Sequence, residues 1–344
     1  MTARTDRLLM AITVILGVGA MSLARPLLVP IAVASLVAFL LRPIVRLLKD
    51  RGLPEAAGAA ITVFGTMALV ATIAVMLASP AADWLRRAPA EITRIESKLR
   101  RLARPFVTIR QTAERVEHAT GGGEREGSVA VESGGPLRQI GWTTASAATT
   151  MLTSVFLTYF LLATGTTLRR KVSRILADDD HRDAMEEALT EIEKQISRYL
   201  LFNTFISASV GVATYVLMRV IGMPNPLLWA ACAFVLNYIP YLGAIVTMAI
   251  IGAAALVSFE GLGQAFGAMG GFLVINLLEA YLVTPALLGR KLPLNSVAIF
   301  IALLFWGWVW GIPGAIMAVP LTVTIQVLCT HVKRLHPVAV LLDS

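Results

Sequence analysis

Charged residues are scarce in this chain of 344 residues, and their scarcity excludes an ordinary soluble domain. Asp, Glu, Lys and Arg make up 15% of the chain, whereas a soluble globular domain has roughly 25%. Hydrophobic residues make up 56%, and the mean hydropathy is +0.72. This composition predicts a membrane protein with several spans.

Cysteine and catalytic motifs are also sparse. The two cysteines, Cys232 and Cys329, lie far apart in apolar segments, which argues against a disulfide or a metal site. The chain has no GxxxxGK[ST] loop to hold phosphates, no HExxH pair and no GxSxG turn. Its four histidines lie outside the predicted membrane core. We therefore expect no enzymatic activity, no cofactor and no bound metal.

Basic residues exceed acidic ones, and their placement indicates membrane topology. The net charge is +8, but no aromatic residues interleave with the basic ones, so we expect no nucleic-acid partner. The basic residues cluster beside apolar runs, at 42–51, 169–174 and 333–334. Cytoplasmic loops carry such clusters. The pattern predicts a multi-pass protein in the lipid bilayer with both termini in the cytoplasm.

The apolar runs predict an all-α polytopic fold with about eight membrane segments, because about 20 residues cross the hydrocarbon core. The predicted parts are N-terminal spans at 1–79, an extracytoplasmic helix and Gly-rich linker at 80–139, a span at 140–163, a cytoplasmic amphipathic helix at 164–199, a C-terminal transport region at 200–335 and a cytoplasmic tail at 336–344.

The insertion at 80–139 carries one apolar stripe at helical spacing. The stripe consists of Ile92, Ile95, Leu99 and Leu102. It fits either a helix that lies on the membrane or on its own domain, or a contact between subunits of a homo-oligomer.

The cytoplasmic segment carries a second stripe that runs directly into the next span. Its members are Met185, Leu189, Ile192, Ile196 and Tyr199. This apolar face must dock either on the membrane surface or on the transmembrane bundle.

Two long apolar runs, 226–258 and 295–330, are interrupted near their middle by proline and glycine. The first contains NYIPYLGAIV, in which Pro240 removes a backbone N–H and breaks a helix. The freed backbone groups need a neighbouring helix, water or a ligand. In the second run, Pro313-Gly314 breaks the helix in the same way. Each run is either one kinked span or a re-entrant helical hairpin, and paired interrupted segments are typical of transporter binding sites.

An acidic residue lies inside a further apolar segment. Asn276 and Glu279 are three residues apart and share one helix face. Glu279 either pairs with a basic residue such as Arg290 near the membrane interface or carries a proton or a cation. Small residues that repeat every four positions predict close helix packing. These are Gly263, Gly267, Gly271, Gly307 and Gly311.

Several segments resemble the autoinducer-2 exporter family of bacterial membrane proteins. They are ISRYLLFN at 196–203, GMPNPLLWA at 222–230, NYIPYLGAIV at 237–246, LVTPALLGRKL at 282–292 and GIPGAIMAVPL at 311–321. The chain departs from the family pattern at Gly243-Ala244, where Gly-Pro is frequent, and at Asn295-Ser296, where His-Pro is frequent. The resemblance implies transport across the bacterial inner membrane without ATP hydrolysis, with quorum sensing or ion exchange as the physiological setting.

The sequence is consistent with three functions. The first is export of a small polar molecule such as autoinducer-2, whose hydroxyl and carbonyl groups suit neutral hydrogen-bonding partners. The second is antiport of Na⁺ or Li⁺ against protons, with Glu279 as the coupling group. The third is a non-transporting membrane scaffold, which would not need buried polar groups at matching depth. The predicted substrate path comprises Asn237, Tyr238, Pro240, Tyr241, Gly243, Asn276, Glu279, Thr284, Pro285, Pro313 and Gly314.

Overall fold

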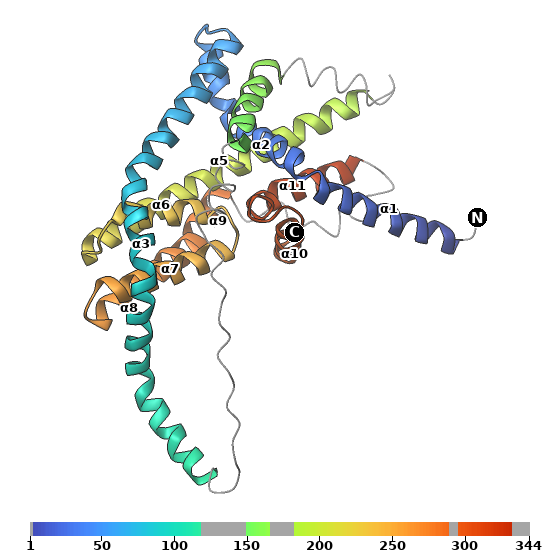
Figure 1. Cartoon of the computed structure of the whole chain (residues 1–344). Coiled ribbons are helices and arrows are strands. Elements are labelled where there is room, and N and C mark those ends of the chain that lie inside the picture. Colours follow the sequence, from blue (N-terminus) through green and yellow to red (C-terminus); the bar gives the residue numbers. More distant parts are fainter. Residues whose placement is uncertain (1–2, 118–148, 166–181, 289–294, 332–344) are drawn as a thin grey trace.

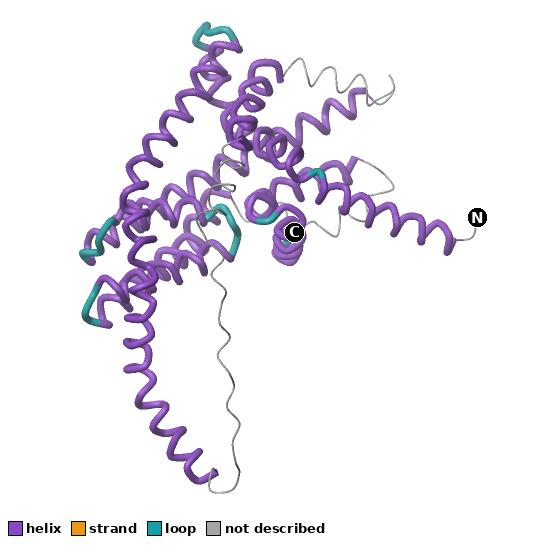
Figure 2. The backbone as a smooth tube through the Cα atoms, in the orientation of Figure 1, coloured by secondary structure: helices purple, strands orange, loops and turns teal. Residues whose placement is uncertain are grey.

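A computed structural model describes residues 3–117, 149–165, 182–288 and 295–331, and every regular element in these ranges is a helix (Figures 1 and 2). The elements are α1 (Ala3–Leu23), α2 (Arg25–Asp50), α3 (Glu55–Glu117), the helix Thr149–Gly165, α5 (Arg182–Ile221), α6 (Pro226–Leu236), α7 (Leu242–Ser258), α8 (Leu262–Leu278), the π-helical turn η3 (Glu279–Val283), α9 (Thr284–Leu288), α10 (Ser296–Trp310) and α11 (Ile312–His331).

Five of the described helices are long and apolar enough to cross a membrane. They comprise α2, the first part of α3 (Glu55–Arg86), the larger part of α5 (Leu189–Ile221), the continuous stretch Leu262–Leu287 and most of α11 (Ile312–Thr330). Four further apolar helices are shorter: Thr149–Gly165, α6, α7 and α10. The predicted all-α polytopic fold is therefore confirmed.

The third helix is much longer than a membrane span. α3 continues through positions 79 and 80 without interruption and extends well beyond the other helices in Figure 1. Its middle is anchored to α6, where the rings of Trp84 and Trp229 meet edge to face with centroids 5.0 Å apart. Ile92 to Leu102 lie on the extending part, whereas the predicted linker at 121–135 and the tail at 336–344 fall outside the described residues.

The stripe that precedes the fifth predicted span docks on the transmembrane bundle. α5 is one continuous helix of 40 residues, so its amphipathic start and its span form a single rod. Ile192, Ile196 and Leu200 are buried in one cluster with Ile299 of α10 and three valines of α11. The three valines are Val319, Val323 and Val327. Tyr199 packs against the same cluster. Of the two alternatives for this face, docking on the bundle is thus the one observed.

Replacing Leu200 by Ala tests this docking, because the neighbouring Leu201 gives a matched control on the same helix. Leu200 is 6% exposed and Leu201 is 42% exposed. A cavity left by a buried leucine costs roughly 2–5 kcal/mol. Leu200→Ala is therefore expected to lower the thermal unfolding temperature of the detergent-solubilised protein clearly more than Leu201→Ala does. Equal shifts, read by tryptophan fluorescence, would contradict the packing of α5 on α10 and α11.

Candidate functional site

The first interrupted run folds as a helical hairpin. α6 ends at Leu236 and α7 begins at Leu242, with residues 237–241 outside any helix. A Cβ atom added to Gly243 would lie 1.9 Å from the carbonyl oxygen of Leu236. Seven residues of continuous helix would separate these positions by about 10 Å. The chain therefore doubles back at Pro240, and only glycine fits at position 243.

The turn of this hairpin holds a strained backbone. Tyr241 has φ 62° and ψ −53°, a region that residues other than glycine rarely occupy. The N–H of Leu242 donates to the carbonyl of Pro240 at 2.6 Å, which closes a three-residue γ-turn around Tyr241. Such a conformation costs on the order of 1–3 kcal/mol and is found at ligand-binding and switch regions when the surroundings impose it.

Side chains of the first hairpin pair with hydroxyl groups of α5. The amide nitrogen of Asn237 donates to the hydroxyl of Ser207 at 3.1 Å. The hydroxyls of Tyr238 and Thr204 lie 2.8 Å apart. The same face of α5 approaches α6 closely at Gly211, where an added Cβ would lie 3.2 Å from the carbonyl oxygen of Ala230. We call Thr204, Ser207, Asn237 and Tyr238 the polar cluster.

The second interrupted run is also a hairpin, but its break lies earlier than predicted. α10 ends at Trp310, and Gly311 has a positive φ of 69°. Pro313 lies in the first turn of α11, where a missing N–H removes no helical hydrogen bond. Glycine at 311 thus breaks the run, and proline starts the next helix. Gly314 then meets the carbonyl oxygen of Trp306, because an added Cβ would lie 2.0 Å from it.

The two hairpins lie next to each other. Ile239, in the turn of the first hairpin, packs against the buried cluster that α10 and α11 form around Trp306, Trp310 and Met317. The indole nitrogen of Trp310 also donates to the carbonyl of Met21 at 3.1 Å, which ties the end of α1 to the second hairpin. Tyr241 and Gly311, which mark the two breaks, are 70 residues apart in the sequence. The fold therefore places side by side two interrupted runs that are separate in the sequence.

Glu279 and Thr284, both predicted site residues, pair with each other. The Thr284 hydroxyl donates to the Glu279 carboxylate across the π-helical turn η3. π-helical turns are frequent at functional sites. The Asn276 amide instead donates to the carbonyl of Phe272 at 2.8 Å, so it does not pair with Glu279 through that bond. Pro285 is exposed on α9. Arg290, the predicted alternative partner of Glu279, lies outside the described residues.

The predicted packing glycines differ in their surroundings. A Cβ added to Gly271 would lie 2.6 Å from the side chain of Leu217 on α5. One added to Gly307 would be 3.8 Å from the Cβ of Ala315. Gly263 and Gly267 have no neighbour within 4 Å among the atoms that the structure describes.

Sequence analysis missed two sets of polar residues. The first is the pair Thr204 and Ser207, whose signal was a face of small and hydroxyl residues that continues to Gly211 and Thr214 at spacings of three and four. The second is an ion cluster of Glu193 with two arginines. Arg42 and Arg46 of α2 approach its carboxylate oxygens at 2.7 and 2.8 Å. In the sequence, Arg42 and Arg46 belong to the basic cluster at 42–51, which indicates membrane topology and not an ion pair.

Comparison with known proteins places these features in a transporter family. The family described as AI-2E family transporter matches residues 9–334. The AI-2 transport protein TqsA of Escherichia coli is 32% identical over 161 residues, which is 46% of each chain. A Haemophilus influenzae protein named "Putative transport protein" is 31% identical over 174 residues, half of each chain. A Mycobacterium tuberculosis protein of the same kind, MT0215, is 26% identical over 304 residues, or 85% of this chain and 79% of the relative.

The match to the first two relatives is partial, since this chain spans about half of their length.

Alanine substitutions at Gly243 and Gly314 test whether the chain reverses direction at the two hairpins. Gly243→Ala and Gly314→Ala each push a methyl group into a backbone carbonyl, which cannot move aside as a flexible side chain can. We expect losses of about 3 kcal/mol or more in stability, the upper range for overpacking. The matched control is Gly267→Ala on α8, where a methyl group meets open space and helix propensity favours alanine by about 1 kcal/mol. The same thermal unfolding temperature for all three variants would contradict the close approach of Gly243 and Gly314 to backbone carbonyls at the two hairpins.

Proposed function

The chain belongs to the AI-2E transporter family, and we propose that it exports a small polar molecule such as autoinducer-2 across the bacterial inner membrane without hydrolysing ATP. The family and the five long apolar helices indicate a multi-pass membrane transporter. Export of autoinducer-2 is inferred from the site. TqsA, the relative whose name specifies AI-2, is similar over about half of its length.

The polar cluster between α5 and the first hairpin is the observation that carries this proposal. It gathers an amide and three hydroxyl groups at a helix break within an otherwise apolar segment. These groups donate and accept without net charge, which suits a neutral molecule rich in hydroxyl and carbonyl groups. The strained turn at Tyr241 and the adjacent second hairpin supply backbone groups near the same place.

We propose a substrate path that runs between the two hairpins and α5, within the transport region 200–335. Asn237 and Tyr238 bind the substrate, while Pro240, Tyr241 and Gly243 shape the first turn and Pro313 and Gly314 the second. Hairpins that enter and leave the membrane on one side leave both chain termini in the cytoplasm, in agreement with the positive clusters. Alternating access then requires the hairpins to move against α5 and the early spans.

Cation–proton antiport is the second candidate, and the pair of Glu279 and Thr284 favours it. A carboxylate and a hydroxyl at a π-helical turn offer the oxygen ligands that a small cation needs, and Glu279 could exchange a proton for it. Glu193 is the buried acid of the described spans, but two arginines neutralise it, whereas Glu279 is half-buried and forms no ion pair among the described residues. Glu279 is therefore the acid that a coupling mechanism would use.

Loss of the polar cluster is expected to slow export of autoinducer-2. Tyr238→Phe removes the hydroxyl that meets Thr204, and Asn237→Ala removes the amide that meets Ser207. A hydrogen bond contributes about 1 kcal/mol, so each variant should transport roughly five- to tenfold more slowly in proteoliposomes. Tyr215→Phe, an exposed tyrosine of α5, is the matched control and should transport like wild type. Wild-type export by Tyr238→Phe and Asn237→Ala would contradict the proposed path.

Glu279→Gln separates the two candidate functions. In proteoliposomes with a proton gradient, we expect autoinducer-2 movement in the wild-type protein and no Na⁺/H⁺ or Li⁺/H⁺ exchange. Loss of autoinducer-2 movement in Glu279→Gln would then indicate proton coupling. Cation exchange without autoinducer-2 movement, abolished by Glu279→Gln and retained by Glu260→Gln in the exposed α7–α8 connection, would favour the antiporter instead.

A further inference from the structure

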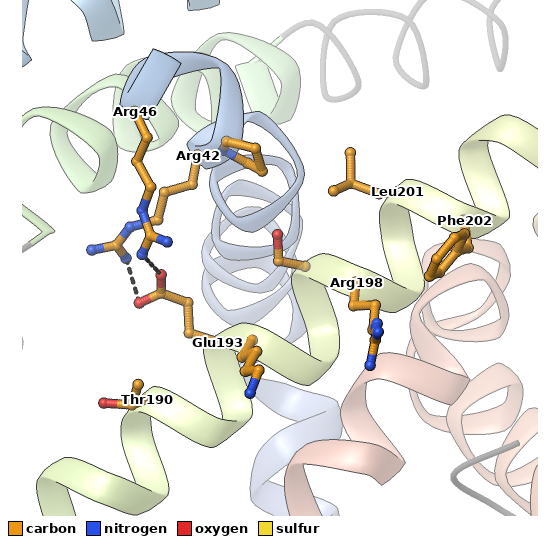
Figure 3. Close-up of a pocket in the computed structure, with 10 residues that line it drawn as sticks. Arg42, Arg46, Thr190, Glu193, Arg198, Leu201 and Phe202 are labelled. Atoms are coloured by element: carbon orange, nitrogen blue, oxygen red, sulfur yellow. Dashed lines mark hydrogen bonds and ion pairs between the residues drawn. The ribbon is translucent and has the colours of Figure 1, made fainter. Parts of the chain in front are cut away.

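A basic pocket lies between α2 and the start of the apolar part of α5, and none of its lining residues belongs to the polar cluster. Its volume is about 400 Å³, within the usual range for small-ligand sites. Figure 3 shows Arg42 and Arg46 reaching from α2 toward Glu193 of α5, with Arg198 further along the same helix. The pocket sits near the C-terminal end of α2, a helix long and apolar enough to cross a membrane.

The walls of this pocket carry an excess of positive charge. Four cations line it: Arg42, Arg46, Lys194 and Arg198. They form two pairs at i, i+4, one on each helix, and like charges at this spacing repel each other. Glu193 is the single acidic residue among the lining residues. One buried carboxylate does not balance four cations, so the pocket favours a negatively charged ligand.

The ion cluster gives the pocket a fixed geometry. Glu193 has a side chain that is 9% exposed, and its two oxygens each receive one arginine at 2.7 and 2.8 Å. An arginine has five N–H donors in a planar fork, so a bond to one carboxylate oxygen orients it without exhausting it. Arginine forks match phosphate oxygens especially well. The carboxylate thus holds two phosphate-binding groups in place.

The other lining residues of the pocket indicate which kind of ligand carries the negatively charged group. The hydroxyl residues Thr190 and Ser197 line the polar part, and Leu201 and Phe202 line the opposite end. Leu201 is exposed on the span itself. A ligand with a phosphate at one end and an apolar chain at the other would meet both kinds of wall. Basic pockets between membrane helices bind anionic lipid headgroups in this way.

We propose that this pocket binds a phosphate group, as presented by the headgroup of an anionic phospholipid. Arg42 and Arg46, oriented by Glu193, grip the phosphate from α2, and Lys194 and Arg198 close on it from α5. The acyl chains leave along Leu201 and Phe202 into the bilayer. The bound lipid joins the end of α2 to α5, the helix whose other face docks on the α10–α11 hairpin. A free phosphate or a phosphorylated solute shares the same chemistry.

Lipid titration of the full chain in detergent tests this proposal. Dioctanoyl-phosphatidylglycerol is compared with zwitterionic dioctanoyl-phosphatidylcholine, and sodium phosphate with sodium chloride at equal ionic strength. Native mass spectrometry counts bound lipid, and the thermal unfolding temperature reports stabilisation. The double variant Lys194→Gln/Arg198→Gln removes two exposed cations and leaves the buried cluster with Glu193 intact. Arg219→Gln, an exposed cation at the other end of α5, is the matched control.

We expect phosphatidylglycerol to bind and stabilise the wild type and Arg219→Gln alike, and to bind the double variant about tenfold more weakly or worse. Added salt should weaken the binding. Stabilisation by lipid alone identifies the headgroup as the source of the phosphate, and equal stabilisation by sodium phosphate identifies a soluble ligand. Equal binding of both lipids, or equal binding by the double variant and the wild type, overturns the proposal. Neither result depends on whether the protein transports autoinducer-2.

Discussion

Backbone N–H and carbonyl groups cost several kcal/mol each when they lie unpaired in hydrocarbon, and the irregular parts of this chain are arranged around that cost. The hydroxyls of Ser154 and Thr158, on the helix Thr149–Gly165, donate to carbonyls of their own helix and also lie 3.4 and 3.3 Å from the carbonyl oxygens of Pro30 and Ala34 on α2. At the turn before α6, the indole of Trp229 donates to the carbonyl of Pro224. In the first hairpin, Pro240 has no N–H for the carbonyl of Leu236, and the N–H of Ile239 donates to that carbonyl instead. At the turn before α6 and in the first hairpin, a carbonyl outside the regular helical pattern thus has a hydrogen-bond partner.

The same constraint explains why both helix breaks pack against neighbouring helices. A helix break that faced lipid would leave its carbonyls unpaired, so both breaks pack against protein, the first on α5 and the second on α1 and α2. Close packing in turn demands glycine where one helix crosses the carbonyl of another, at Gly243 and at Gly314. α5 is central to this arrangement because one face carries the hydroxyls of the polar cluster, while its start carries Glu193 and the docking stripe. Within the proposed mechanism, movement of the hairpins against α5 would remake the contacts of the polar cluster.

Much of the fold could be predicted from the sequence. The length of a hydrophobic run and the positions of proline and glycine determine where a helix begins and ends, and all three are local features of the sequence. Both interrupted runs and the stripe from Ile192 to Tyr199 follow from such signals. The break at Gly311 was assigned to Pro313 because proline is read as a breaker, although it suits the first turn of a helix equally well. Thr204 and Ser207 carry a weak signal, the face of small and hydroxyl residues that they share with Gly211 and Thr214, because such residues are common in membrane helices. The pairing of Arg46 with Glu193 joins residues 147 positions apart, and the π-helical turn at Glu279 depends on the fold, so neither could be predicted from local patterns.

Thiol labelling from the aqueous phase measures whether the polar cluster faces a water-filled path or lipid. Asn237→Cys and Val235→Cys are made in a chain in which Cys232 and Cys329 are replaced by serine. Asn237 belongs to the polar cluster, whereas Val235 is exposed on the apolar surface of α6, where hydrocarbon would surround it. If the path is water-filled, a charged, membrane-impermeant thiol reagent modifies Asn237→Cys, autoinducer-2 slows this reaction, and Val235→Cys stays unmodified. Modification of Val235→Cys with no modification of Asn237→Cys would contradict a water-filled path at the polar cluster.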